Sequence, residues 1–141
     1  MSKVAVVYWS GTGNTEQMAE KVAAGAKNVG AEVSVFTAAD FSADQMDAFD
    51  AIAFGCPSMG AEQLEESEFE PMFRECEAKL AGKKIALFGS YGWGDGEWMR
   101  NWEEQCLADG AVLACEFAIC NEAPDAEAEI ACMELGKSLA E

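Results

Sequence analysis

A turn rich in glycines and hydroxyl side chains follows the first apolar run of the chain. Its glycines, Gly11 and Gly13, let the backbone curl so that successive N–H groups point inward. A helix pattern begins directly afterwards, and a helix N-terminus carries partial positive charge. No lysine or arginine lies between Lys3 and Lys21, so neutral donors would hold a bound phosphate monoester. The predicted phosphate-binding residues are Ser10, Gly11, Thr12, Gly13, Asn14 and Thr15.

Two common phosphate-binding motifs do not describe this turn. A Walker loop requires Gly-Lys-Ser/Thr, which does not follow here, and Glu16 stands where a dinucleotide fingerprint has its third glycine. The alternative without a ligand is a turn that merely caps the following helix.

Two further loops follow the third and fourth apolar runs and place large side chains among glycines. Met59 and Trp93 are two of these, and both sulfur and indole pack well on the face of a planar ring. Core packing is the usual role of such residues, but glycine-flanked loop positions argue against it. The loops also contain Ser58, Gly60, Glu62, Ser90, Tyr91, Gly92 and Gly94.

The absence of histidine removes the usual nucleophilic triads and the commonest zinc sites. Six cysteines occur without any Cys-x-x-Cys pair, so no zinc ribbon, iron–sulfur cluster or redox dithiol is indicated. Cys76, Cys106 and Cys132 fall on apolar helix stripes, which predicts buried free thiols. We therefore expect no metal and no catalytic residue, and we assign any chemistry to a bound cofactor.

The formal charge of −17 comes from 26 acidic and 9 basic side chains. Such a charge disfavours nucleic acids and anionic membranes as partners and favours basic protein surfaces. No apolar run is long enough to span a bilayer, and the N-terminus shows no signal-peptide pattern. These features predict a cytoplasmic protein.

Apolar strand-like runs alternate with helix-period segments along the 141 residues, which predicts one α/β domain over residues 1–141. This alternation indicates a five-stranded parallel sheet with helices on both faces. Ligands of such sheets bind outside the carboxyl ends of the strands. The expected strands are 3–8, 32–36, 51–55, 84–90 and 111–117, and the expected helices are 14–29, 42–49, 69–80, 98–109 and 128–139.

These segments together resemble the short-chain, clostridial-type flavodoxins over nearly the whole chain. The resemblance rests on the turn at 10–15, the Met59-Gly60 loop with Glu62, the run at 90–93, and the pairs at 121–122 and 124–125. It implies the strand order 2-1-3-4-5 in a three-layer sandwich. No insertion is expected in the fifth strand, which excludes the long-chain class.

The resemblance also implies the role of each site residue toward one non-covalent FMN. The turn at 10–15 would bind the phosphate, Met59 and Trp93 would flank the isoalloxazine ring, and Glu62 would accept a hydrogen bond from flavin N3. The Met59–Gly60 peptide would turn on one-electron reduction so that its carbonyl faces flavin N5. Lesser contacts are expected from Ser90, Tyr91, Gly92 and Asn121. Acidic residues expected around the ring are Glu62, Glu65, Glu66, Asp95 and Glu97.

The function implied is that of a low-potential, one-electron carrier that replaces ferredoxin. Its expected partners are redox enzymes with basic docking patches, such as ferredoxin or flavodoxin oxidoreductases and hydrogenase, and the carrier itself is expected to be a monomer. An FMN-dependent reductase on the same fold is the alternative. A flavin-free receiver module is rejected, because the third strand ends in Gly55-Cys56 without the required aspartate.

Overall fold

The computed structural model describes residues 2–59, 63–92 and 94–141 of the chain. Its centre is a parallel sheet in the order β2-β1-β3-β4-β5, and β6 pairs with the C-terminal half of β4. The predicted order 2-1-3-4-5 is therefore confirmed. The strands are β1 (Lys3–Tyr8), β2 (Glu32–Thr37), β3 (Ala51–Gly55), β4 (Lys84–Tyr91), β5 (Val112–Leu113) and β6 (Ala118–Asn121).

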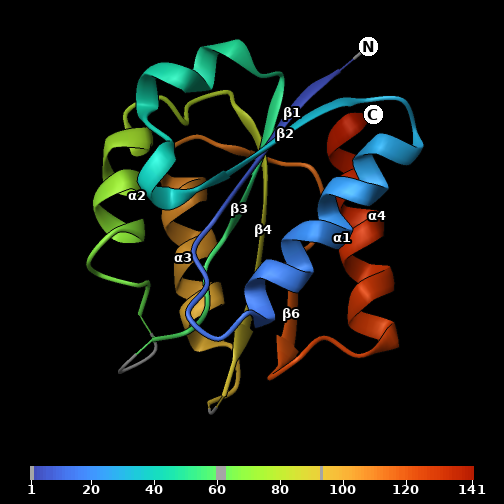
Figure 1. Cartoon of the computed structure of the whole chain (residues 1–141). Helices are drawn as coiled ribbons and strands as arrows, with labels where there is room; N and C mark the ends of the chain where they lie inside the picture. The colour runs from blue at the N-terminus through green and yellow to red at the C-terminus, as the bar shows by residue number, and fades with distance from the viewer. Residues whose placement is uncertain (1, 60–62, 93) are drawn as a thin grey trace.

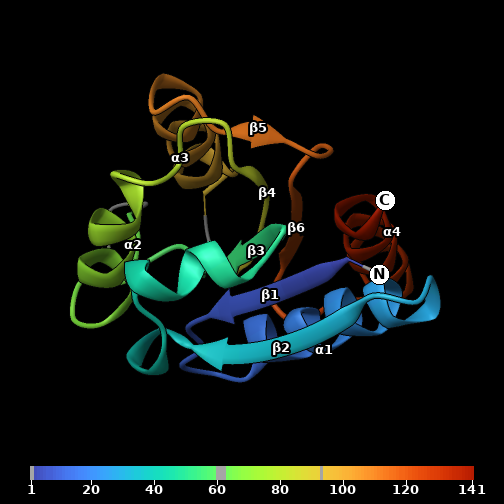
Figure 2. The ribbon, with the colours of Figure 1, turned by 90° about the horizontal axis from the view of Figure 1, so that it is seen from above.

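Helices cover both faces of this sheet, as expected. In both views α1 and α4 lie on one side of the strands, and α2 and α3 lie on the other (Figure 1; Figure 2). None of the helices in the described ranges is long and apolar enough to cross a membrane. The helices are α1 (Asn14–Asn28), α2 (Phe69–Glu77), α3 (Glu97–Ala108) and α4 (Ala126–Ala140), with the 3₁₀ turns η1 (Ala38–Asp40) and η2 (Ala43–Ala48).

Two expected elements differ from the structure in form. The segment expected as a helix at 42–49 is the 3₁₀ turn η2, although the predicted capping box between Ser42 and Gln45 is present. The helix expected at 69–80 is α2, which ends at Glu77, and Leu80 is buried in the turn that follows it.

The expectation of one continuous fifth strand at 111–117 is wrong. Leu113 pairs with Ile85 and Ala118 pairs with Phe88. The chain therefore advances by five residues where β4 advances by three. Residues 114–117 leave the ladder between β5 and β6. This sheet edge accommodates the two surplus residues, because no further strand requires a matching register there, and Phe117 packs against the core.

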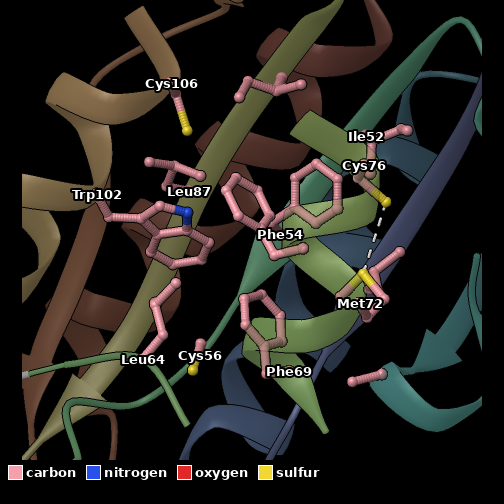
Figure 3. Close-up of a cluster of buried hydrophobic side chains, with 14 of the residues drawn as sticks. Ile52, Phe54, Cys56, Leu64, Phe69, Met72, Cys76, Leu87, Trp102 and Cys106 are labelled. Atoms are coloured by element: carbon pink, nitrogen blue, oxygen red, sulfur yellow. Dashed lines mark hydrogen bonds between the residues drawn. The ribbon is translucent and has the colours of Figure 1, made fainter. Parts of the chain in front are cut away.

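The core between the sheet and the helices α2 and α3 is aromatic (Figure 3). The ring centroids of Phe54 and Phe73 lie 5.2 Å apart, and those of Phe69 and Trp102 lie 5.4 Å apart, both pairs edge to face. Cysteines are buried in this core and in the core between the sheet and the helices α1 and α4. Free cysteine is expected to act there as a small apolar side chain. The buried free cysteines are Cys56, Cys76, Cys106, Cys120 and Cys132, and Cys115 is half-buried.

On the opposite face α1 and α4 approach closely through glycines. A Cβ on Gly25 would lie 2.0 Å from the Met133 carbonyl oxygen, and one on Gly136 would lie 2.0 Å from the Val22 carbonyl oxygen. Backbone therefore meets backbone at this crossing, and the contact fixes the second half of α1 against α4.

Candidate functional site

A cavity of about 230 Å³ opens at the carboxyl ends of the strands. Segments that follow β1, β3, β4 and β6 all contribute to its wall, so the loops singled out in the sequence do converge. No lysine or arginine lines it among the described residues. The lining consists of Trp9, Gly11, Thr12, Asn14, Pro57, Ser58, Met59, Ser90, Tyr91, Gly92 and Glu122.

The turn after β1 is shaped to present donors. Gly13 has a φ of 94°, which glycine adopts without steric cost. The Ser10 hydroxyl oxygen accepts from the N–H of Gly13 at 3.1 Å and from the N–H of Glu16 at 3.3 Å. Its single hydrogen is then left to donate to a ligand. The first N–H groups of α1, at Asn14 and Thr15, have no acceptor within the helix.

The Thr15 hydroxyl lies beneath this turn rather than on its surface. Thr15 Oγ1 and Ser90 Oγ are 2.9 Å apart, and both residues are buried. This hydrogen bond links the first turn of α1 to the end of β4. The sequence predicts a phosphate-binding role for Thr15. Its hydroxyl pairs with Ser90, with either oxygen as the donor, and its backbone N–H has no acceptor within α1.

The loop after β3 is held against β4 by its backbone. Ser58 N–H donates to the Ser90 carbonyl at 3.0 Å, while Met59 and Gln63 exchange two backbone hydrogen bonds at 2.8 and 2.9 Å. The Met59 side chain is 37% exposed, so it is not a core residue. Because the Met59 carbonyl already accepts from Gln63, turning it toward a flavin would break this bond. Gly60 and Glu62 lie outside the described residues.

The loops after β4 and β6 are joined through Tyr91. The Asn121 side-chain amide donates to the Tyr91 carbonyl at 3.2 Å, and the Glu122 N–H donates to it at 2.8 Å. Asn121 and Gly94 do not line the cavity, and Trp93 lies outside the described residues. Ser10 and Gly13 line an adjoining cavity on the side of β2.

Three lining residues escaped the sequence reasoning, namely Trp9, Pro57 and Glu122. Trp9 donates from its indole nitrogen to the Glu68 carboxylate at 3.0 Å, a partner distant in sequence. Glu122 has a φ of 61°, an uncommon conformation for a residue other than glycine. Each of them lies next to a residue or motif that the sequence predicts for the site: Trp9 precedes the glycine turn, Pro57 precedes Ser58, and Glu122 belongs to the pair at 121–122.

A parallel sheet in this order, with a turn of N–H and hydroxyl donors after its first strand and a cavity at the carboxyl ends of its strands, defines a doubly wound α/β protein. The sequence profile of the flavodoxin family matches residues 6–136. The chain therefore belongs to the flavodoxin family.

Individual relatives agree with this assignment. The chain is 50% identical over 135 residues to a flavodoxin of Clostridium beijerinckii, covering 96% of this chain and 97% of that protein. It is 48% identical over 137 residues to a flavodoxin of Megasphaera elsdenii, covering 97% and 98%. The solution structure of the two-electron reduced Megasphaera elsdenii flavodoxin superposes with a TM-score of 0.90, at 48% identity over 97% of this chain and 98% of that one. The chain is thus an electron-transfer flavoprotein.

Proposed function

We propose that the chain binds one FMN non-covalently at the carboxyl ends of its strands and carries single electrons at low potential. In this role it would act as a monomer between redox enzymes, in place of ferredoxin. The observation that supports the proposal is the convergence of four strand-end segments on one cavity that no lysine or arginine of the described chain lines.

The residues of the turn after β1 fit a phosphate monoester. Ser10 has its hydroxyl hydrogen free, Thr12 is exposed beside it, and the N–H groups of Asn14 and Thr15 point from the helix N-terminus. A dianionic phosphate suits such neutral donors, because the helix end supplies partial positive charge. Met59 offers a thioether to the face of the ring.

FMN would supply the redox chemistry of the protein when bound. The chain would bind its phosphate, orient its ring between strand-end loops, and set the electrostatic field around it. Glu122 lines the cavity and Glu97 is exposed just beyond the loop after β4, whereas Asp95 is paired with Arg100 at 3.0 Å. The carboxylates of Glu122 and Glu97 oppose further negative charge, which favours a low potential.

The same acidic surroundings would guide the choice of partner. A chain of charge −17 attracts basic surfaces over long distances. We therefore assign the docking patch of the donor or acceptor, such as an oxidoreductase or hydrogenase that otherwise uses ferredoxin, to clustered lysines and arginines. Association should weaken as ionic strength rises.

A fluorescence titration of the apoprotein with FMN and with riboflavin tests the proposal. We expect stoichiometric quenching of FMN and binding of riboflavin weaker by at least about tenfold, since riboflavin lacks the group that the turn would hold. Thr12→Ala should weaken FMN binding but not riboflavin binding. Ser34→Ala removes a hydroxyl of β2 that lines neither this cavity nor the adjoining one and serves as the control.

Two results would contradict the proposal. Equal affinity for FMN and riboflavin would show that the turn does not hold a phosphate. Steady oxidation of NAD(P)H by the purified protein alone would support the reductase alternative instead of the carrier.

A further inference from the structure

Glu65 is the one acidic side chain buried among the described residues, with 5% of its surface exposed. It was expected in the acidic surroundings of the flavin, but it points inward at the start of α2. Oε1 accepts from the N–H groups of Glu68 and Phe69, each at 2.8 Å. Oε2 accepts from the Ser67 N–H at 2.8 Å and also from the Ser67 hydroxyl.

These bonds make Glu65 the cap of α2, although it lies four residues before the first helical position, Phe69. Burial raises the pKa of Glu65, but the hydrogen bonds from Ser67, Phe69 and Glu68 outweigh that effect, and the net pKa is lowered. The side chain is therefore a carboxylate at neutral pH, compensated by the positive end of the helix.

The backbone of Glu65 closes the base of the loop that follows β3. Its N–H donates to Cys56 Sγ at 3.3 Å, at the end of β3, and its carbonyl accepts from the Glu70 N–H at 2.8 Å. Within this base, Met59 and Gln63 form the antiparallel backbone pair described above, and this pair of residues is called the Met59–Gln63 hairpin. The position of the hairpin thus depends on where Glu65 is fixed.

We propose that Glu65 is a positioning residue for the flavin: by capping α2 it holds the Met59–Gln63 hairpin in place at the cavity wall. The inference rests on the proposed function, because it assumes that FMN occupies that cavity. Glu65 acts through the hairpin and needs no contact with the cofactor.

Replacing Glu65 with glutamine isolates this role. An amide keeps the size of the side chain, but in either orientation its NH₂ group faces N–H donors where a carboxylate oxygen accepted. Glu66→Gln is the matched control, because Glu66 is exposed and the change removes the same charge one position away. Loss of a negative charge alone should leave the binding of anionic FMN unchanged or strengthen it.

The measurements are FMN affinity by fluorescence titration and amide hydrogen exchange of the FMN-loaded protein. We expect Glu65→Gln to weaken FMN binding by about tenfold relative to Glu66→Gln, the equivalent of losing one charge-assisted hydrogen bond. The amides of Met59 and Gln63 should exchange faster in Glu65→Gln, while those of β4 stay protected. A role in global stability alone would not confine the change to the hairpin.

Equal FMN affinity of the two variants, with unchanged exchange at Met59 and Gln63, would overturn the inference while leaving the proposed function intact. Failure of the unmodified chain to bind FMN would overturn both. If Glu65→Gln does not fold, Ser67→Ala tests the same inference, because it removes only the hydroxyl that donates to Glu65. We expect that variant to bind FMN about threefold more weakly, and unchanged binding and exchange would overturn the inference.

Discussion

The buried pair of hydroxyls formed by Thr15 and Ser90 can be tested by removing its members singly and together. Thr15 is fully buried and Ser90, although it lines the cavity, is only 4% exposed, so both hydroxyls are largely shielded from water. Thr15→Val keeps the shape of the side chain without its hydroxyl, and Ser90→Ala removes one oxygen. Each single change leaves the other hydroxyl buried without a partner.

The magnitude follows from that asymmetry. A buried polar group without a partner costs about 1–3 kcal/mol, whereas replacing both partners with apolar groups is nearly neutral. We therefore expect each single variant to lose about 1.5 kcal/mol of unfolding free energy and the double variant to lose about 1 kcal/mol. Independent sites would instead give a sum of about 3 kcal/mol, so the coupling is about 2 kcal/mol.

The assay is urea-induced unfolding of the apoprotein, followed by circular dichroism at 25 °C. The dependence of free energy on urea should be the same in all four proteins, which shows that the compared states are unchanged. A loss in the double variant equal to the sum of the two single losses would refute the reasoning. It would mean that neither hydroxyl depends on the other.

Three further predictions concern the rest of the chain. Gly25→Ala should cost about 3 kcal/mol in urea unfolding, despite the higher helix propensity of alanine, because the new Cβ would lie 2.0 Å from the Met133 carbonyl oxygen; a gain in stability would contradict the close crossing of α1 and α4. Burial, followed by a hydrogen bond with Asp109, raises the pKa of Glu77, so this pair stabilises the fold at low pH and loses that contribution as pH rises through the folded pKa. Asp109→Asn should therefore raise the unfolding free energy at pH 7 by about 1 kcal/mol and leave it unchanged near pH 4, as thermal unfolding at both pH values would show. Raising the salt concentration should shift the second reduction potential of the FMN-loaded protein upward, because salt screens the repulsion between the acidic side chains and the reduced flavin. One like charge about 10 Å from the flavin costs about 1.7 kcal/mol, or about 70 mV. A potential independent of salt would oppose the electrostatic explanation.

The sequence predicts the strands and helices correctly where local residue patterns determine their bounds. The expected bounds of β1 and β3 match the structure, because the glycine turn that begins at Ser10 closely follows the first apolar run and Gly55 ends the other. The fifth strand was not readable in this way. The run 111–117 is almost wholly apolar, and the break at residues 114–117 depends on pairing with β4, which is remote in sequence.

The site shows the same division between local and remote causes. The composition of the glycine turn is enough to predict it from the sequence. The direction of the Thr15 hydroxyl is not predictable in this way, because it depends on Ser90, which is 75 positions away. Glu65 stands in an acidic stretch with Glu66 and Glu68. Sequence alone does not distinguish the buried carboxylate from its exposed neighbours, since the distinction arises only when α2 packs on the sheet.

The burial of the cysteines makes this chain suitable for labelling without mutagenesis. Five of its thiols are buried, and Cys115, in the bulge between β5 and β6, is the half-buried exception. A thiol-reactive dye should therefore modify the folded protein at Cys115 first and reach the others only after unfolding. Because burial raises the pKa of the Cys115 thiol, its reaction should be slow at neutral pH and faster in alkali. The native chain would then carry a single reporter at the sheet edge.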